Sequence, residues 1–207
     1  MELLVATRSA DKLTEIRRIL AVVPGLRVID LDAAGIPEAD EEDHLEPHDT
    51  FEQNARSKAE YFFAKSGIPT IADDSGLEVD ALGGAPGVRS KRFAPDRGLS
   101  GKALDQSNNN HLMERLSDVA EGARTGRYVC AAVLVGFHEG PISVRGEAEG
   151  VILHQPQGAG GFGYDPYFFD PELDCTFAQL SAEEKNARSH RGAAFRALAK
   201  RLEGRDA

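Results

Sequence analysis

The sequence lacks the features that would point to membranes or nucleic acids. No apolar run approaches the roughly 20 residues that a membrane-spanning helix needs. Basic residues are in deficit, since 24 Lys and Arg stand against 34 Asp and Glu and leave a formal net charge of −10. Because binders of duplex DNA or of membrane surfaces usually carry the opposite sign, we expect neither partner.

Cysteine is also scarce. Cys130 and Cys175 lie far apart and form no Cys-x-x-Cys pattern. Two free thiols in a reducing cytoplasm fit this pattern best, so we expect a cytoplasmic protein. The segment Met1–Thr7 is apolar for only a few residues and has no basic lead-in, which favours a first strand over a signal peptide.

The composition is that of a globular domain, with 207 residues of which 41% are hydrophobic and 28% charged. No repeat, low-complexity segment or linker divides the chain. We therefore expect a single domain over residues 1–207, long enough to bury a real core.

Strand and helix patterns alternate along the chain. Leu13, Ile16, Leu20 and Val23 recur at helical spacing after a short apolar run. Capping boxes at Thr50 and Ser181 predict two further helix starts, and residues 193–202 form a last amphipathic helix. Predicted strands occupy residues 3–6, 26–31, 70–72, 128–137 and 142–153. This interleaving indicates an α/β protein.

Other segments are predicted to be irregular. The third strand is expected to end at residues 73–76. The acidic stretch 38–49 is interpreted as a solvated, mobile loop, and the polar residues 95–110 as a surface loop. Residues 158–166 form a Gly-rich loop.

The first candidate site follows the first strand and opens the first helix. A helix N-terminus presents free N–H groups and the positive end of a dipole, and a lysine adds a charge, so a phosphate is a suitable ligand. The alternative is an ordinary capped helix with a surface lysine. The residues are Thr7, Arg8, Ser9, Ala10, Asp11 and Lys12.

The second candidate is the adjacent pair Asp73 and Asp74. Two neighbouring carboxylates repel each other, and sharing a divalent cation relieves the repulsion. Mg²⁺ usually takes one or two carboxylates together with substrate phosphates. The alternative is a solvated turn with Ser75 and Gly76.

The third candidate combines Glu46 with Asn54 and Lys58, which lie four residues apart on a predicted helix. A carboxylate, an amide and an ammonium in that order suit a metal–phosphate site, although a solvated helix face is the simpler interpretation. The pattern His44-x-Glu46-x-His48 would also suit zinc if it were extended, but no third strong ligand is evident.

Two further candidates concern a base. Phe162 stands between glycines, where it can stack on a base or pack in the core. Lys185, Ser189, His190 and Arg191 supply polar donors that can read a base edge or hold phosphates, or simply form a cationic surface loop.

Five motifs in this order resemble the inosine triphosphate pyrophosphatase family. They are Phe51–Ala59, Ala72–Leu77, Gly83–Val88, Gly161–Pro166 and Glu184–Gly192. The resemblance implies an α/β fold with an elongated mixed sheet flanked by helices, and two lobes with a central active-site cleft. It also implies a homodimer and a Mg²⁺ cofactor.

The resemblance assigns roles to individual residues. It makes Asp74 the general base and a metal ligand, and it makes Glu46 and Asp73 metal-binding acids. Lys12 and Lys58 are implied to bind the phosphates. Asp74 and Lys58 are the implied catalytic residues. Asn54 and Ser75 are expected beside the substrate. The base is expected to meet Phe162, Gly163, Tyr164, Asp165, Lys185, His190 and Arg191.

The first loop departs from the family pattern, and Lys91 stands where the family usually has a small neutral residue after Ser90. The first loop is usually Gly-rich with an Asn before the lysine, whereas this chain has Arg8, Ser9 and Asp11.

The expected activity is hydrolysis of noncanonical purine nucleoside triphosphates (ITP, dITP and XTP) to the monophosphate and pyrophosphate, which sanitises the nucleotide pool. Selectivity is expected from hydrogen-bond donors that can donate to the 6-oxo group of the base but cannot pair with the amino group of adenine. The alternatives are a pyrophosphatase with a different base preference, and a nucleotide-binding protein without turnover.

Overall fold

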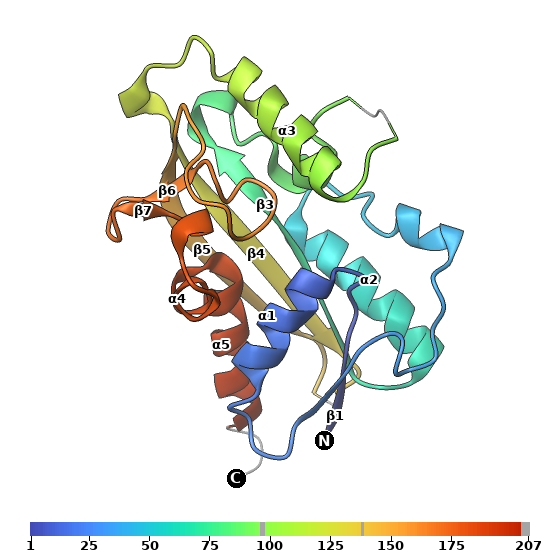
Figure 1. Cartoon of the computed structure of the whole chain (residues 1–207). Helices are drawn as coiled ribbons and strands as arrows, with labels where there is room; N and C mark the ends of the chain where they lie inside the picture. Colours follow the sequence, from blue (N-terminus) through green and yellow to red (C-terminus); the bar gives the residue numbers. More distant parts are fainter. Residues whose placement is uncertain (96–97, 138, 204–207) are drawn as a thin grey trace. The chain divides into compact units, whose positions relative to one another are not determined.

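The computed structural model describes residues 1–95, 98–137 and 139–203 (Figure 1). Its seven-stranded sheet has the order β2-β1-β3-β4-β5-β6-β7. The strands are β1 (Glu2–Val5), β2 (Arg27–Ile29), β3 (Thr70–Val79), β4 (Thr125–Val135), β5 (Ile142–Ile152), β6 (Phe168–Asp170) and β7 (Cys175–Thr176). β1 runs parallel to β2 and β3, whereas β6 runs antiparallel to β5 and β7. The sheet is therefore mixed.

Helices accompany the sheet. The α-helices are α1 (Ala10–Leu20), α2 (Phe51–Ser66), α3 (Gly101–Arg115), α4 (Ala182–Arg188) and α5 (His190–Glu203). Short 3₁₀ turns are η1 (Asp40–His44), η2 (Asp80–Leu82), η3 (Gly87–Arg92), η4 (Glu121–Ala123) and η5 (Phe177–Gln179). The α/β class with a mixed sheet flanked by helices is confirmed. None of the helices in the described ranges is long and apolar enough to cross a bilayer.

The chain divides into two compact units, and the divisions fall inside β3, β4 and β5 and between α4 and α5. Unit 1 contains residues 1–74, 130–146 and those from His190 onward, and unit 2 contains residues 75–129 and 147–189. The single domain, the elongated outline and the central cleft stay predictions.

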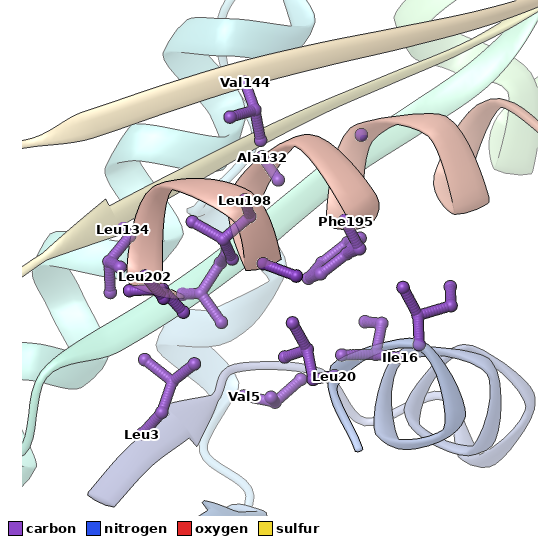
Figure 2. Packing of buried hydrophobic residues seen from close by; sticks show 14 of the residues in the cluster. Leu3, Val5, Ile16, Leu20, Ala132, Leu134, Val144, Phe195, Leu198 and Leu202 are labelled. Atoms are coloured by element: carbon purple, nitrogen blue, oxygen red, sulfur yellow. The ribbon is translucent and has the colours of Figure 1, made fainter. Parts of the chain in front are cut away.

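Unit 1 has an apolar layer on each face of its strands. Successive residues of β4 alternate between the layers, since Ala132 and Leu134 pack with α1 and α5 while Val133 and Val135 pack with α2. Figure 2 shows Phe195 and Leu198 of α5 among the side chains of the first layer. The two layers fix the helices that carry the candidate residues of unit 1.

Unit 2 has its own core, which is rich in aromatic side chains. Phe168 lies 4.5 Å from Tyr128 and 4.8 Å from Phe177, measured between ring centroids. Leu112 and Leu116, from α3 and its C-cap, join them and are fully buried. This core supports the Gly-rich loop.

The predicted helix starts are confirmed. Thr50 Oγ1 accepts a hydrogen bond from the Gln53 amide at 3.3 Å, and α2 begins at the next residue. Ser181 and Glu184 form the reciprocal capping box of α4. Both caps satisfy N–H groups that a helix leaves without a partner.

Two predictions of irregular structure are wrong. Residues 73–76 continue β3 as far as Val79. The polar run treated as a surface loop contains most of α3, although residues 96 and 97 lie outside the described residues. In both cases polar composition suggested irregular structure, whereas tertiary partners accommodate the polar side chains in a strand or a helix. The acidic stretch 38–49 contains the short turn η1 and has no buried residue, as expected of a solvated loop, and its mobility stays a prediction.

Candidate active site

The first loop is organised by its own hydroxyls. Thr7 Oγ1 accepts a hydrogen bond from the Ser9 amide at 3.1 Å, and Ser9, the N-cap of α1, accepts one from the Lys12 amide at 3.3 Å. This cap directs Lys12 toward β3, where its ammonium lies 3.1 Å from Asp73 Oδ2. Ala10 and the exposed Asp11 form the first turn of α1.

Arg8 has protein partners of its own. Its guanidinium donates to both carboxylate oxygens of Glu42, at 2.9 and 2.7 Å, and to the Ile36 carbonyl at 3.1 Å. It also lies 5.9 Å from the centroid of the Phe62 ring. These contacts tie the first loop to the acidic segment, and a role of Arg8 in binding substrate stays a prediction.

Asp73 is buried among cations. Besides Lys12, the Arg191 Nε lies 3.5 Å from its carboxylate, and Arg191 also donates to Glu15 at 2.6 Å. Burial alone would raise the pKa of Asp73, but the charges of Lys12, Arg191 and Lys58 together bring it well below its usual value. Asp73 is therefore ionised in this setting.

Lys58 connects two carboxylate-bearing segments. Its ammonium donates to Glu46 Oε1 at 2.6 Å and to the Asp73 carbonyl at 2.5 Å. Burial would lower the pKa of Lys58, but the charges of Glu46, Asp74 and Asp73 raise it. The lysine is thus held as a cation beside three acids.

Asn54 orients Asp74. Its amide Nδ2 donates to Asp74 Oδ2 at 3.0 Å and to the His48 carbonyl at 3.1 Å, while its Oδ1 accepts from the His48 amide at 2.9 Å. The same side chain therefore fixes the segment that follows Glu46. Burial, reinforced by the charge of Glu46, raises the pKa of Asp74 despite the opposing charges of Lys58 and Lys12 and the Asn54 hydrogen bond.

The donor set was compared with the needs of a cation. Among residues 1–95, 98–137 and 139–203, no three His, Cys, Asp or Glu side chains gather into a metal-binding group, which gives the zinc pattern no support. Mg²⁺ has smaller needs, because one or two carboxylates and substrate phosphates suffice. Glu46 and Asp74 fit, since the charge of one raises the pKa of the other.

In unit 2, Asp165 is a buried aspartate with a lysine partner. Asp165 Oδ2 accepts from Lys185 Nζ at 2.6 Å and from the Phe162 amide at 2.9 Å, while Oδ1 accepts from the Tyr128 hydroxyl at 3.2 Å. Gly161 adopts φ +69°, and a Cβ there would collide with the Asp165 carboxylate. The backbone therefore closes tightly around this carboxylate.

Phe162 has a charged neighbour. Lys185 Nζ lies 4.3 Å from the centroid of its ring, a cation–π contact. The Tyr164 hydroxyl donates to the Ser90 carbonyl at 2.7 Å, and burial raises the pKa of Tyr164. Direct contact of Tyr164 or Gly163 with a substrate stays a prediction.

The C-terminal motif is divided between the units. Lys185 and Ser189 belong to unit 2, whereas His190 and Arg191 open α5 in unit 1; Ser75 belongs to unit 2 and Asp74 to unit 1. The structure brings together Lys12, Glu46, Asn54, Lys58, Asp73, Asp74 and Arg191 in unit 1, and Phe162, Asp165 and Lys185 in unit 2.

Four further residues contribute to the site although they were not predicted from the sequence: Glu15, Glu42, Tyr128 and Cys130. Glu15 follows Lys12 by three residues and so shares its helix face, a spacing that could have revealed it. Tyr128 stands in a predicted strand. No sequence pattern pointed to Glu42, the partner of Arg8. None pointed to Cys130 either, whose Sγ lies 3.9 Å from Asp73 Oδ2.

Two relatives are similar to this chain over nearly its whole length. A dITP/XTP pyrophosphatase of Aromatoleum aromaticum is 47% identical over 200 residues, covering 97% of this chain and 96% of the relative. A protein of the same name from Thioalkalivibrio sulfidiphilus is 42% identical over 207 residues, covering 99% and 100%.

Solved structures agree. A HAM1 protein from Coxiella burnetii superimposes with a TM-score of 0.85 at 32% identity, covering 99% of each chain. The Ham1 protein of Staphylococcus aureus gives 0.83 at 33% identity, covering 99% of this chain and 100% of the other. The resemblance inferred from the five motifs is confirmed, and since residues 3–201 match its family model, this chain belongs to the Ham1 family.

Proposed function

We propose that this chain hydrolyses ITP, dITP and XTP to the nucleoside monophosphate and pyrophosphate, and thereby sanitises the nucleotide pool. The observation that carries the proposal is Asp74, a buried carboxylate with a raised pKa, oriented by Asn54 and placed beside the Lys58–Glu46 pair. The names of the relatives support the substrate class.

Asp74 acts as the general base. The oxygen of a water molecule attacks the α-phosphorus in line, its proton passes to the Asp74 carboxylate, and the bond to the bridging oxygen breaks to release pyrophosphate. A raised pKa brings the carboxyl closer to working pH and makes it a better proton acceptor. Lys58 and Lys12 place positive charge where the phosphates gather negative charge.

Mg²⁺ is the proposed cofactor, held by Glu46 and Asp74. When bound, it neutralises charge on the phosphate oxygens. Asp73 is the third proposed ligand, and its carboxylate also contacts Lys12 and Arg191. Through its ion pair with Lys12, Asp73 also fixes the position of that lysine at the start of α1.

Phe162 and two polar donors are proposed to recognise the base. Lys185 lies over the Phe162 ring, and the base stacks on that aromatic side chain. Lys185 and His190 are the donors proposed for the 6-oxo group, which adenine lacks. Arg191 contributes chiefly by holding Asp73, as its two ion pairs indicate.

The proposal includes a cytoplasmic homodimer. Cys130 and Cys175 are free thiols, as suits a reducing compartment. Light scattering of the purified protein, compared with the monomer mass of 22.3 kDa, tests the dimer.

The decisive experiment is pyrophosphate release from ITP, dITP, XTP, dUTP, ATP and GTP, with Mg²⁺ and after its removal by chelation. We expect metal-dependent release that strongly favours ITP, dITP and XTP. A preference for dUTP would instead support a different base specificity, and tight binding of ITP without release would support a binding protein.

A further inference from the structure

Two side chains of helix α3 hydrogen-bond to the backbone of Gly163 in the Gly-rich loop. The Gly163 amide donates to Asp105 Oδ2 at 3.0 Å, and the Gly163 carbonyl accepts from Asn109 Nδ2 at 2.9 Å. Asp105 and Asn109 lie four residues apart and so occupy one face of the helix. Both polar backbone groups of Gly163 are therefore bound by side chains of α3.

The helix itself is anchored. Asn108 Oδ1 accepts from the Ala94 amide at 2.9 Å, and its Nδ2 donates to the Lys91 carbonyl at 3.1 Å. Asn108 and Asn109 are buried, although asparagine is a poor helix former and a buried amide is costly unless it is hydrogen-bonded. The polar character of α3 thus has a use in holding neighbouring backbone.

These hydrogen bonds to Gly163 fix the backbone next to Phe162. On the other side, the Phe162 amide is bound by Asp165, and Lys185 lies over the ring. Gly161 and Gly163 both have positive φ, so an unrestrained loop of this composition would sample many conformations. Ordering such a loop upon binding would weaken affinity, whereas a loop fixed beforehand avoids that cost.

We propose that Asp105 and Asn109 are positioning residues that order the loop Gly161–Asp165 before the nucleotide arrives. They set the affinity for the purine base and the discrimination between bases, without touching the reacting phosphates. The proposal rests on the proposed function, in which Phe162 stacks on the base.

The test compares variants of α3 in KM and kcat for ITP and ATP. Asp105→Ala is expected to raise KM for ITP by about tenfold, the scale of one lost hydrogen bond, with kcat within about twofold of wild type. The preference for ITP over ATP should fall. Asp105→Asn keeps an acceptor oxygen and should restore wild-type behaviour. Gln106→Ala, an exposed neighbour bonded to Asn110, is the matched control.

Hydrogen exchange gives a readout independent of activity. The Gly163 amide should lose protection in Asp105→Ala and regain it in Asp105→Asn. Lost protection with an unchanged KM would overturn the proposal, as would a fall in kcat alone. If the wild type releases no pyrophosphate from any nucleotide, the proposed function fails, while the exchange result still reports whether α3 orders the loop.

Discussion

The two units each bury an aspartate against a lysine, but the surroundings differ. Asp165 is balanced by Lys185 and further satisfied by the Tyr128 hydroxyl and the Phe162 amide. Asp73 belongs to a larger group, in which four carboxylates among the described residues (Glu15, Glu46, Asp73, Asp74) meet three cations (Lys12, Lys58, Arg191).

The difference separates structure from chemistry. A balanced, fully hydrogen-bonded pair fixes a loop and leaves no group to react. Burial, reinforced by the neighbouring carboxylate of Glu46, raises the pKa of Asp74, and the excess of carboxylates gives this group a use for a further cation. The comparison therefore predicts that unit 1 variants lose catalysis, whereas unit 2 variants lose stability or nucleotide affinity.

The largest effect is expected for Asp74→Asn. It should lower kcat by about 10²–10⁴-fold, the usual contribution of a general base, with the fold retained. Pyrophosphate release and circular dichroism check both parts. Activity near that of wild type would remove Asp74 from the proposed mechanism. Asp32→Asn, in an almost fully exposed acid, is the control.

The same variant makes a prediction about stability and pH. The pKa of Asp74 is higher in the folded state than in the unfolded state, where it is about 3.9. Above both values the ionised carboxylate lowers the free energy of unfolding, and below the unfolded value it has no effect. Without metal, Asp74→Asn should therefore unfold at a higher temperature than wild type at neutral pH. The gain should vanish as the pH falls to about 3.9. Calorimetry across this range tests the direction.

The next effect concerns the two lysines. Lys185→Met leaves Asp165 buried with no ammonium opposite it and should cost about 3–5 kcal/mol of unfolding free energy. Lys12→Met should cost less, because Asp73 keeps Arg191. Urea unfolding of both variants measures the difference. Equal losses would contradict the contrast between a balanced pair and a shared network.

A smaller effect is expected from two glycines with similar backbone angles. Gly161 and Gly67 have φ of +69° and +67°, but a Cβ would meet the Asp165 carboxylate only at Gly161. Gly67→Ala should cost about 1 kcal/mol from backbone conformation alone. Gly161→Ala should cost clearly more, and thermal unfolding of the pair isolates the steric part.

The smallest effect is expected for Arg8→Ala. The Arg8 hydrogen bond is the main reason that the pKa of Glu42 lies below its usual value. The pair therefore stabilises the fold above the unfolded Glu pKa of about 4.3, and the contribution is lost as the pH falls through the lower folded value. Because Arg8 is partly exposed, the loss at neutral pH should be under about 1 kcal/mol.

Arg8→Lys provides the comparison, since it keeps the charge but loses the two-pronged contact. Urea unfolding at neutral pH and near pH 3 tests the sign. A destabilisation of Arg8→Ala that grows as the pH falls would contradict the assigned cause.

Local chemistry determined much of this protein from sequence alone. The hydroxyls of Thr50 and Ser181 marked helix starts because a cap needs only neighbouring residues. The apolar composition of residues 128–137 predicted a buried strand, which is β4, and residues 142–153 were predicted as another strand, which is β5. The order of the five motifs also predicted the residue types of the candidate site and indicated the family that the chain resembles.

Tertiary structure decided what depends on distant partners. Asp73 and Asp74 stay within β3 because Lys12, Arg191 and Asn54 compensate their burial, and no local rule supplies those partners. Likewise, α3 tolerates its asparagines because they bind backbone far along the chain. Residue types follow from sequence, whereas the pKa of Asp74 depends on burial and on charges that only folding brings together, and so does the pairing of Arg8 with Glu42.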